Sequence, residues 1–325
     1  MKKLILSIAA LFSLSAEAAP NSELIKATLE AQPSCSNFVR YDDQNLYLGF
    51  GWYRNALEEP RMPIPAKMRV APFDGTAPFE LATKDAAIDV VTDGTTAYVL
   101  TYSSIEEWDL IRRERVAAYP TYAINGPLAY KQHAQGMARY KDKLIIAHGR
   151  LGVSIFNIKT KRLVNQFRLV QWQLPLESMA MGATVQGNLA YVVMDNFHVT
   201  RPGDGVKIFR GIIVVNLDSE SVQSELGGMD PGADSIVSDS KKVIVSFGGI
   251  PIWKYGIGTL RGSSIPEPEI RIWRFPVNGH PTGAPVMDDK YYYSCFSKAP
   301  AFPGDNGGYY RRMPLALDRR VLMLD

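Results

Sequence analysis

A pair of short β-rich runs separated by a polar turn recurs six times along this 325-residue chain. One residue in the second run of each pair can be taken as an equivalent anchor, and successive anchors lie 46 to 52 residues apart. The six anchors are Tyr47, Tyr98, Ile145, Tyr191, Val243 and Tyr291. Such a period in β-rich sequence is typical of stacked structural repeats, because one repeat alone cannot bury its apolar faces.

A second motif follows each anchor and consists of an apolar or aromatic residue, usually followed by a short polar one. The pairs are Phe73-Asp74, Trp108-Asp109, Phe156-Asn157, Val215-Asn216, Trp273-Arg274 and Leu317-Asp318. We assign them to the third strand of each repeat and the turn into a fourth strand, where Asp or Asn can bond the backbone of the turn. The sequence therefore predicts an all-β fold, a six-bladed β-propeller of four-stranded antiparallel blades, as a single domain over residues 37–325. A two-sheet sandwich or two small β domains is the alternative, since these folds also have evenly spaced strands.

Strings such as Trp108-Asp109-Leu110 and Ala190-Tyr191-Val192-Val193 resemble those of bacterial exported β-propellers of the YVTN and WD-repeat-like type. The resemblance covers nearly the whole chain beyond its N-terminal segment. It implies the propeller fold and no particular function. The repeats lack the Gly-His pair of true WD repeats, and their period is longer than the roughly 40 to 45 residues of that class.

Residues 1–18 have the pattern of a secretory signal peptide. Lys2 and Lys3 precede the apolar stretch 4–14, and Ala16-Glu17-Ala18 supplies a cleavage site. We expect a periplasmic or secreted protein without a transmembrane segment, because the apolar stretch is too short to span a bilayer. An uncleaved anchor is the alternative. Residues 19–36 are expected to form an N-terminal segment with a short amphipathic helix over 22–31.

The chain has two cysteines, Cys35 and Cys295. An even count in an oxidising compartment favours a disulfide. In a ring of blades, the segment before the first strand lies beside the last blade, so this bridge would close the ring. The alternative is two separately buried thiols, because spacing in the sequence does not fix the distance between them.

The spacing from the second-strand anchor to the third-strand anchor is uneven. It is 10 residues in the second repeat, 11 in the third and 24 to 30 in the other four. These connections leave a four-stranded meander at one end, so the insertions of blades 4, 5, 6 and 1 are expected to form a wall on one face. Their aromatic and Arg side chains are typical of binding surfaces. The candidate ligand-binding residues are Trp52, Arg54, His198, Arg201, Trp253, Tyr255, Tyr310 and Arg311. Alternatively, these side chains pack the long loops onto the blades.

The mouth of the central channel is expected to be ringed by residues that enter the first strands. These are Asn37, Asp89, His133, Met181, Asp234 and Met287. Asn37, Asp89 and Asp234 are the candidate metal ligands, and Ca²⁺ is the metal that would suit them, but it needs six to eight oxygen ligands. We therefore predict no cofactor and keep Ca²⁺ as an alternative. Asp89 and Asp234 could equally cap backbone amides at the strand starts.

The charge balance argues against a nucleic-acid partner, since 36 Lys and Arg against 33 Asp and Glu give a net charge of only +3. The sequence contains no Gly-x-Ser-x-Gly elbow and no His pair with the spacing of a zinc helix, so no catalytic residue is named. We predict an exported, monomeric binding or scaffolding protein that holds a protein, peptide or glycan partner of the cell envelope on the face with the long loops. The alternative is a metal-dependent hydrolase of the lactonase or esterase type, with its site at the channel mouth.

Overall fold

The structure is a computed structural model, and it is almost entirely β-strand. It describes residues 20–35, 37–51, 65–123, 133–167, 179–195, 211–227, 235–238, 242–247, 256–261, 271–273, 280–297 and 312–320. Within these residues the strands form five sheets, and one helix, α1 (Ser22–Glu30), precedes them. The predicted all-β class is therefore confirmed.

Four of the five sheets contain four antiparallel strands each, as predicted. The first two are built from β5 (Asp89–Asp93), β6 (Thr96–Leu100), β7 (Ser104–Asp109) and β8 (Glu114–Pro120), and from β9 (Gly136–Tyr140), β10 (Lys143–Ala147), β11 (Val153–Asn157) and β12 (Arg162–Phe167). The other two are built from β13 (Met179–Gln186), β14 (Leu189–Asp195), β15 (Gly211–Asn216) and β16 (Ser221–Gly227), and from β17 (Ser235–Ser238), β18 (Lys242–Phe247), β19 (Gly256–Arg261) and β20 (Arg271–Trp273).

The fifth sheet has seven strands and joins the two ends of the chain. Its strands are β1 (Phe38–Tyr41), β2 (Asn45–Phe50), β3 (Lys67–Pro72) and β4 (Phe79–Leu81), followed by β21 (His280–Met287), β22 (Tyr291–Ser297) and β23 (Arg312–Asp318). The two groups meet where β1 runs parallel to β21, with Phe38 paired to Ala284. All other pairings in this sheet are antiparallel.

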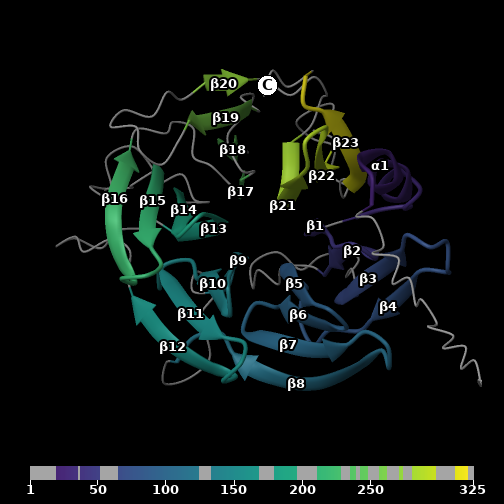
Figure 1. The fold of residues 1–325 in the computed structure, drawn as a ribbon, viewed down its shortest axis with the longest axis horizontal. Helices are drawn as coiled ribbons and strands as arrows, with labels where there is room; N and C mark the ends of the chain where they lie inside the picture. The colour runs from purple at the N-terminus through teal and green to yellow at the C-terminus, as the bar shows by residue number, and fades with distance from the viewer. Residues whose placement is uncertain are drawn as a thin grey trace, which may run out of the picture.

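The sheets lie side by side around a common centre, with the first strand of each innermost and the last outermost (Figure 1). The apolar core lies between neighbouring sheets. In one cluster Ile145 and Ile155 of the β9–β12 sheet pack with Ala183, Val192 and Ile213 of the next, all of them buried. Each sheet thus buries a face against its neighbour, which stabilises the fold by roughly 25 cal/mol per Å² of apolar surface removed from water. All six predicted anchor residues lie in second strands.

The turns from third to fourth strands are held by Asx side chains, as predicted. Oδ1 of Asp109 accepts the backbone N–H groups of Ile111 and Arg112, each at 2.9 Å. Asn157 and Asn216 make the equivalent pairs of hydrogen bonds in the next two sheets. Each side-chain oxygen accepts N–H groups of the turn backbone that would otherwise bond to water. The Asx residue therefore fixes the turn at the same place in each of these repeats.

The motif assignment is wrong in one repeat. Trp273 lies in β20, the fourth strand of its sheet, and the third strand is β19. The segment Gly256–Arg261 carries no aromatic-Asx pair, so a search for that motif passes over it to the next aromatic residue. The 30-residue spacing from Val243 to Trp273 therefore includes two connections, of which only residues 248–255 join the second strand to the third.

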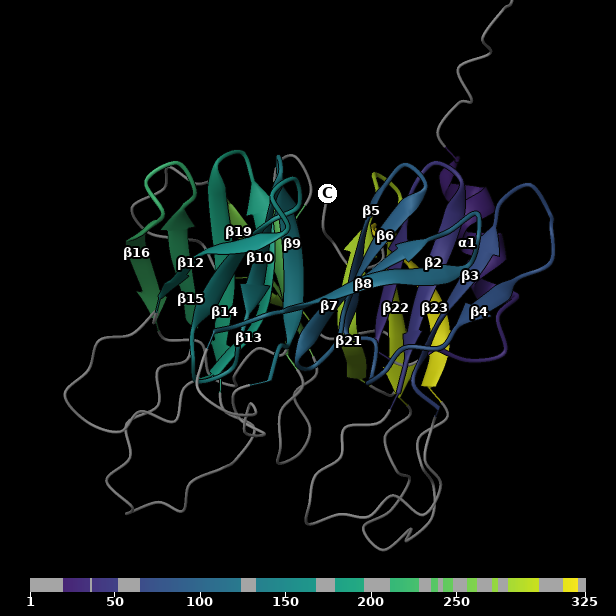
Figure 2. The same ribbon diagram turned by 90° about the horizontal axis from the view of Figure 1, so that it is seen from below.

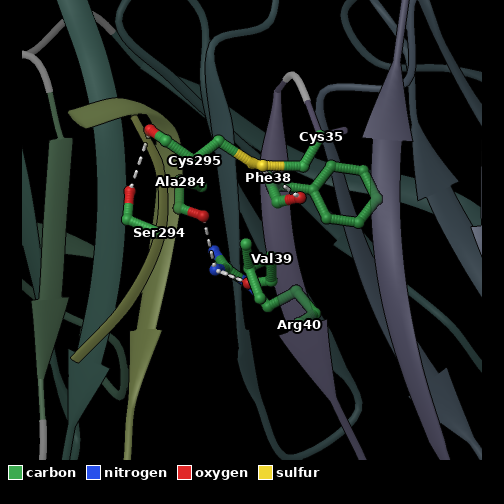
Figure 3. Close-up of a disulfide and its surroundings, with 7 residues drawn as sticks. All are labelled: Cys35, Phe38, Val39, Arg40, Ala284, Ser294 and Cys295. Carbon is green, nitrogen blue, oxygen red and sulfur yellow. Dashed lines mark hydrogen bonds between the residues drawn. A yellow bond between two sulfur atoms is a disulfide. The ribbon is translucent and has the colours of Figure 1, made fainter. Parts of the chain in front are cut away.

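Helix α1 and the disulfide hold the chain ends together. Ile25 and Leu29 are buried in a cluster with residues of β2, β22 and β23. Glu23 pairs with Lys290 and accepts the Tyr291 hydroxyl at 2.9 Å. Cys35, just before β1, is bonded to Cys295 of β22, with their Cα atoms 5.7 Å apart (Figure 3). The predicted helix and disulfide are confirmed.

Candidate functional site

The candidate site is the face at which the first strand of each sheet begins, which we call the loop face. In an antiparallel meander the connection from second to third strand returns to this same face, and the turns from first to second and third to fourth strands lie on the opposite turn face. Figure 2 shows the ring from the side, with its two faces above and below the sheets. Asn37 marks the loop face at β1, where its N–H donates to the carbonyl of Gly49 at 2.9 Å.

Four connections leave and return at the loop face that are longer than the tight turns of the other two sheets; three have 14 to 16 residues and the fourth, 248–255, has eight, and we call these four the long connections. The strand residues that bound them are paired across the ladder as Phe50 with Lys67, Met194 with Gly211, Phe247 with Gly256 and Ser297 with Arg312. The eight candidate ligand-binding residues belong to these connections. Trp52, Arg54, His198, Arg201, Trp253, Tyr255, Tyr310 and Arg311 all lie outside the described residues. Their role stays a prediction.

Two connections on the same face are short and fully described. In the β5–β8 sheet, the N–H of Thr101 donates to the carbonyl of Ser104 at 2.8 Å. In the β9–β12 sheet, the N–H of His148 donates to the carbonyl of Gly152 at 2.8 Å. Gly152 has a φ of +94°, a backbone conformation that disfavours a side chain. Both of these connections are tight turns.

Two Tyr–His pairs occupy the junction of these two sheets. The rings of Tyr102 and His133 are stacked with centroids 5.1 Å apart, and those of Tyr122 and His148 meet edge to face at 5.3 Å. His148 is buried, and His133 is half-buried. The N–H of Ala134 donates to the carbonyl of Tyr102 at 3.0 Å, which locks the two segments together. The two pairs form a layer of aromatic and imidazole rings at this junction, which we call the Tyr–His floor.

Sequence reasoning did not find this floor. It placed His133 near the channel mouth and found no spacing that relates the four histidines to one another. Tyr102 and Tyr122 follow the second and fourth strands of one sheet, and the histidines flank the first two strands of the next. The recurrence of an aromatic residue just after a second strand is the one signal that could have pointed to it.

The predicted metal ligands are only partly described. Asp234 lies outside the described residues. The Asn37 amide donates to the carbonyls of Gly51 at 3.3 Å and Ala87 at 2.9 Å, so it joins β2 to the next sheet. Met287 was expected at the start of a first strand, but it ends β21 and pairs with Tyr292 on the turn face.

Asp89 serves as an acceptor for protein donors. Oδ1 accepts from Arg40 Nε and the N–H of Val90, each at 2.9 Å. Oδ2 accepts from Arg40 Nη2 at 3.0 Å and the N–H of Met137 at 3.1 Å. Burial raises the pKa of Asp89, against the opposing effect of the Arg40 charge and these N–H groups.

The surroundings of Asp89 do not fit a Ca²⁺ site. Each carboxylate oxygen already has two donors, so a cation would have to displace Arg40. Among the residues that the structure describes, no three His, Cys, Asp or Glu side chains are grouped to hold a metal ion. Within the same residues, no helix has both the length and the hydrophobicity that a membrane span requires.

Comparisons with known proteins address the fold. No family model matches the sequence, and no curated protein matches it. Among solved structures, the Dos1 propeller matches with a TM-score of 0.53 and 9% identity, over 82% of this chain and 67% of that chain. The Neurospora crassa Pan2 WD40 domain matches with a TM-score of 0.52 and 5% identity, over 83% and 77%. The chain is a β-propeller.

The likeness to other propellers shows the fold alone. Kuenenia stuttgartiensis hydrazine synthase also matches, with a TM-score of 0.48 and 13% identity, over 70% of this chain. This chain covers 60% of that chain, less than two thirds of its length. Propellers host many unrelated functions, so the site has to carry the functional argument.

Proposed function

We propose that this chain is an exported six-bladed propeller that binds a protein, peptide or glycan of the cell envelope on its loop face. The observation that carries the proposal is the placement of the four long connections. All four start and end on one face, at strand residues paired across the ladder. The sequence of these connections is rich in Trp, Tyr and Arg, the residue types that contribute most at binding interfaces.

The six-blade count rests on reading the seven-stranded sheet as two blades. Among the described residues, the one ladder pairing between its halves is Phe38 with Ala284, and each half is an antiparallel meander. After β23, Oδ1 of Asp318 accepts the N–H of Arg320 at 2.9 Å, as the Asx residues do before the fourth strands of other sheets. Residues 37–325 then form one domain.

Export is supported by the disulfide as well as by residues 1–18. Stable disulfides form in oxidising compartments, and Cys35 and Cys295 are both buried as a pair. We infer a periplasmic or secreted, monomeric protein whose mature chain begins at Ala19. Mass spectrometry of the protein exported from a bacterial host should give the mass of residues 19–325 with an intact disulfide. A mass that includes residues 1–18 would contradict export by cleavage.

A two-stage binding experiment tests the loop-face function. The purified protein is used to capture components from an envelope extract, and the component enriched is then purified and titrated by calorimetry. The double variant W253A/R311A should bind it at least about tenfold more weakly, because aromatic and Arg anchors dominate interface energies. V164S, on the outer strand β12, is the matched control and should bind normally.

Two outcomes would overturn the proposal. One is unchanged affinity of W253A/R311A for the captured component. The other is a stoichiometric bound metal whose removal by EDTA abolishes esterase or lactonase turnover, which would favour the hydrolase alternative.

A further inference from the structure

A cavity of about 520 Å³ lies on the turn face, where the β1–β4 sheet, the β5–β8 sheet and the start of α1 meet. Its size is within the range of sites that hold small ligands or short peptide segments. Apolar side chains from all three parts line it: Leu24, Pro72, Phe73, Phe79, Leu110 and Ile111. Ile111 is 74% exposed and Leu24 is 38% exposed. Exposed apolar residues gathered in a hollow are typical of a binding site.

The charged side chains that line this cavity are two carboxylates and one guanidinium, so its formal charge is −1. The carboxylates of Asp43 and Asp74 both line it and are exposed. Among the described residues, neither forms an ion pair. Arg113 also lines the cavity and keeps its positive charge, with its guanidinium held 4.1 Å from the centre of the Phe79 ring.

Asp74 is held in place as an anion. Its Oδ1 accepts the N–H of Thr76 at 2.8 Å and the Thr76 hydroxyl at 2.7 Å. These hydrogen bonds lower the pKa of Asp74, so its carboxylate is charged at neutral pH. Nearby, Gly94 is a turn tip with a φ of +62°, and no atom lies within 4 Å of the position its Cβ would take. The rim there is open to an extended chain.

We propose that this cavity binds a linear segment of another protein in which aliphatic side chains are flanked by Lys or Arg. The aliphatic side chains would pack against Phe73, Leu110 and Ile111, and the flanking cations would pair with Asp43 and Asp74. A second copy of this chain fits less well, because a twofold contact through this face would bring like carboxylates together. The site lies on the face opposite the long connections, so it is independent of the loop-face function.

The test uses fluorescently labelled, end-capped tetrapeptides and anisotropy at low and at physiological salt. Lys-Leu-Leu-Lys is the positive probe, and Glu-Leu-Leu-Glu and Lys-Ser-Ser-Lys are the controls. The first should bind saturably and weaken with salt. Each control should bind at least about fivefold more weakly, since it lacks either the cations or the apolar contacts.

Variants of the protein locate the site. D43N/D74N should weaken Lys-Leu-Leu-Lys by roughly fivefold and leave Glu-Leu-Leu-Glu unchanged or tighter. I111S should weaken it by about tenfold, because the aliphatic contact is lost. V164S, an aliphatic-to-serine change at a 49% exposed position on β12, is the control. All of these residues are exposed, and Asn at 74 keeps an oxygen for Thr76, so the fold is retained.

Three results would overturn the proposal. The first is no saturable binding of Lys-Leu-Leu-Lys by the wild-type protein. The second is equal loss in V164S and I111S. The third is light scattering that shows a dimer which I111S converts to a monomer, because the cavity would then be covered by a second copy.

Discussion

Arg40 of β1, half-buried, and Asp89 of β5, fully buried, form an ion pair with Nε 2.9 Å from Oδ1 and Nη2 3.0 Å from Oδ2. The same Asp89 accepts the N–H of Met137 from β9, and Nη1 of Arg40 donates to the carbonyl of Ala284 in β21 at 3.1 Å (Figure 3). One pair of side chains therefore links the innermost strands of four successive parts of the ring.

Replacing Asp89 should strongly destabilise the propeller. D89A leaves the Arg40 guanidinium without its carboxylate, and breaking a buried pair in this way costs about 3–5 kcal/mol. Urea unfolding followed by fluorescence measures the loss. D93N is the control, because Asp93 lies in the same strand and pairs with Arg139 of the β9–β12 sheet but is 55% exposed, and it should cost at most about 1 kcal/mol. Similar losses in both variants would contradict the central role of the pair.

Gly136 should not tolerate a methyl group. A Cβ at this position would lie 3.0 Å from the Cα of Gly182 in the neighbouring inner strand, so two backbones would have to separate. G136A is expected to cost about 1–3 kcal/mol of unfolding free energy. At Gly182 a Cβ would make ordinary contacts of 3.6 Å or more with Ile236 and Val193, so G182A should be much milder. Chemical denaturation of the two variants side by side makes the comparison, and the reverse order would refute it.

Lys161 should stabilise the contact between two outer regions of the ring. It has a left-handed backbone, with a φ of +57°, and its Nζ lies 2.8 Å from Oε1 of Glu107 in the preceding sheet. K161M is expected to cost about 1 kcal/mol, because this pair is partly shielded from water. K159M removes a lysine two residues earlier that pairs with Asp142 and is 73% exposed. It should leave the unfolding midpoint unchanged, and a cost equal to that of K161M would argue against the contact.

The docking of α1 should weaken in acid. Hydrogen bonds from Lys290 and Tyr291 lower the pKa of Glu23 below its ordinary value of 4.5. Because the folded pKa is the lower one, the stabilisation is complete above about pH 4.5 and is lost as pH falls through the folded pKa. Hydrogen exchange of the peptide containing Ser22–Glu30 should speed up over that range. E23Q should exchange faster already at neutral pH and show no such step, and an identical acid step in E23Q would assign it to another group.

Removing the disulfide should lower stability and loosen the seam between the chain ends. Cys35 and Cys295 are 260 residues apart, and the chain-entropy argument gives an upper figure of about 5 kcal/mol for a loop this long. C35A/C295A should melt at a lower temperature and expose α1 to exchange. In the native wild-type protein both sulfur atoms are buried, so alkylation after mild reductant should be slow until denaturant is added. Rapid alkylation without denaturant would contradict the burial of this disulfide.

The parts of the fold that sequence reasoning predicted correctly are local ones. The anchors such as Tyr98 and Tyr191 lie in second strands because period-2 β runs and turn residues specify strands without distant contacts. Asp109 and Asn157 hold their turns through hydrogen bonds that reach only two or three residues along the chain. The exception, Trp273, was assigned to the wrong strand because β19 lacks the local motif.

The candidate site was predicted less completely, because its contacts cross between sheets. Tyr102 stacks on His133, 31 positions later in the chain, and no spacing rule relates a residue after one sheet's second strand to one before the next sheet. From the sequence, Asp89 was a candidate metal ligand or a cap of backbone amides. The structure shows that its carboxylate accepts hydrogen bonds from Arg40 and from two backbone N–H groups. The composition of the long connections could be predicted, and the strand pairs that bound them fix the face they leave. The length of the connection after β18 was overestimated, because Trp273 was assigned to the third strand.

The amino-acid sequence by itself determined the β repeat, most of the Asx turns and the helix that begins at Ser22, because periodicity and turn chemistry act within one repeat. Two cysteines allow a single pairing, but the structure decided that Cys35 and Cys295 are bonded. Only the tertiary structure decided which side chains meet at the centre of the ring and between neighbouring sheets. Arg40, Asp89 and Met137 come together because stacking places successive first strands side by side, and that distance depends on how closely neighbouring sheets pack, not on any pattern within one of them.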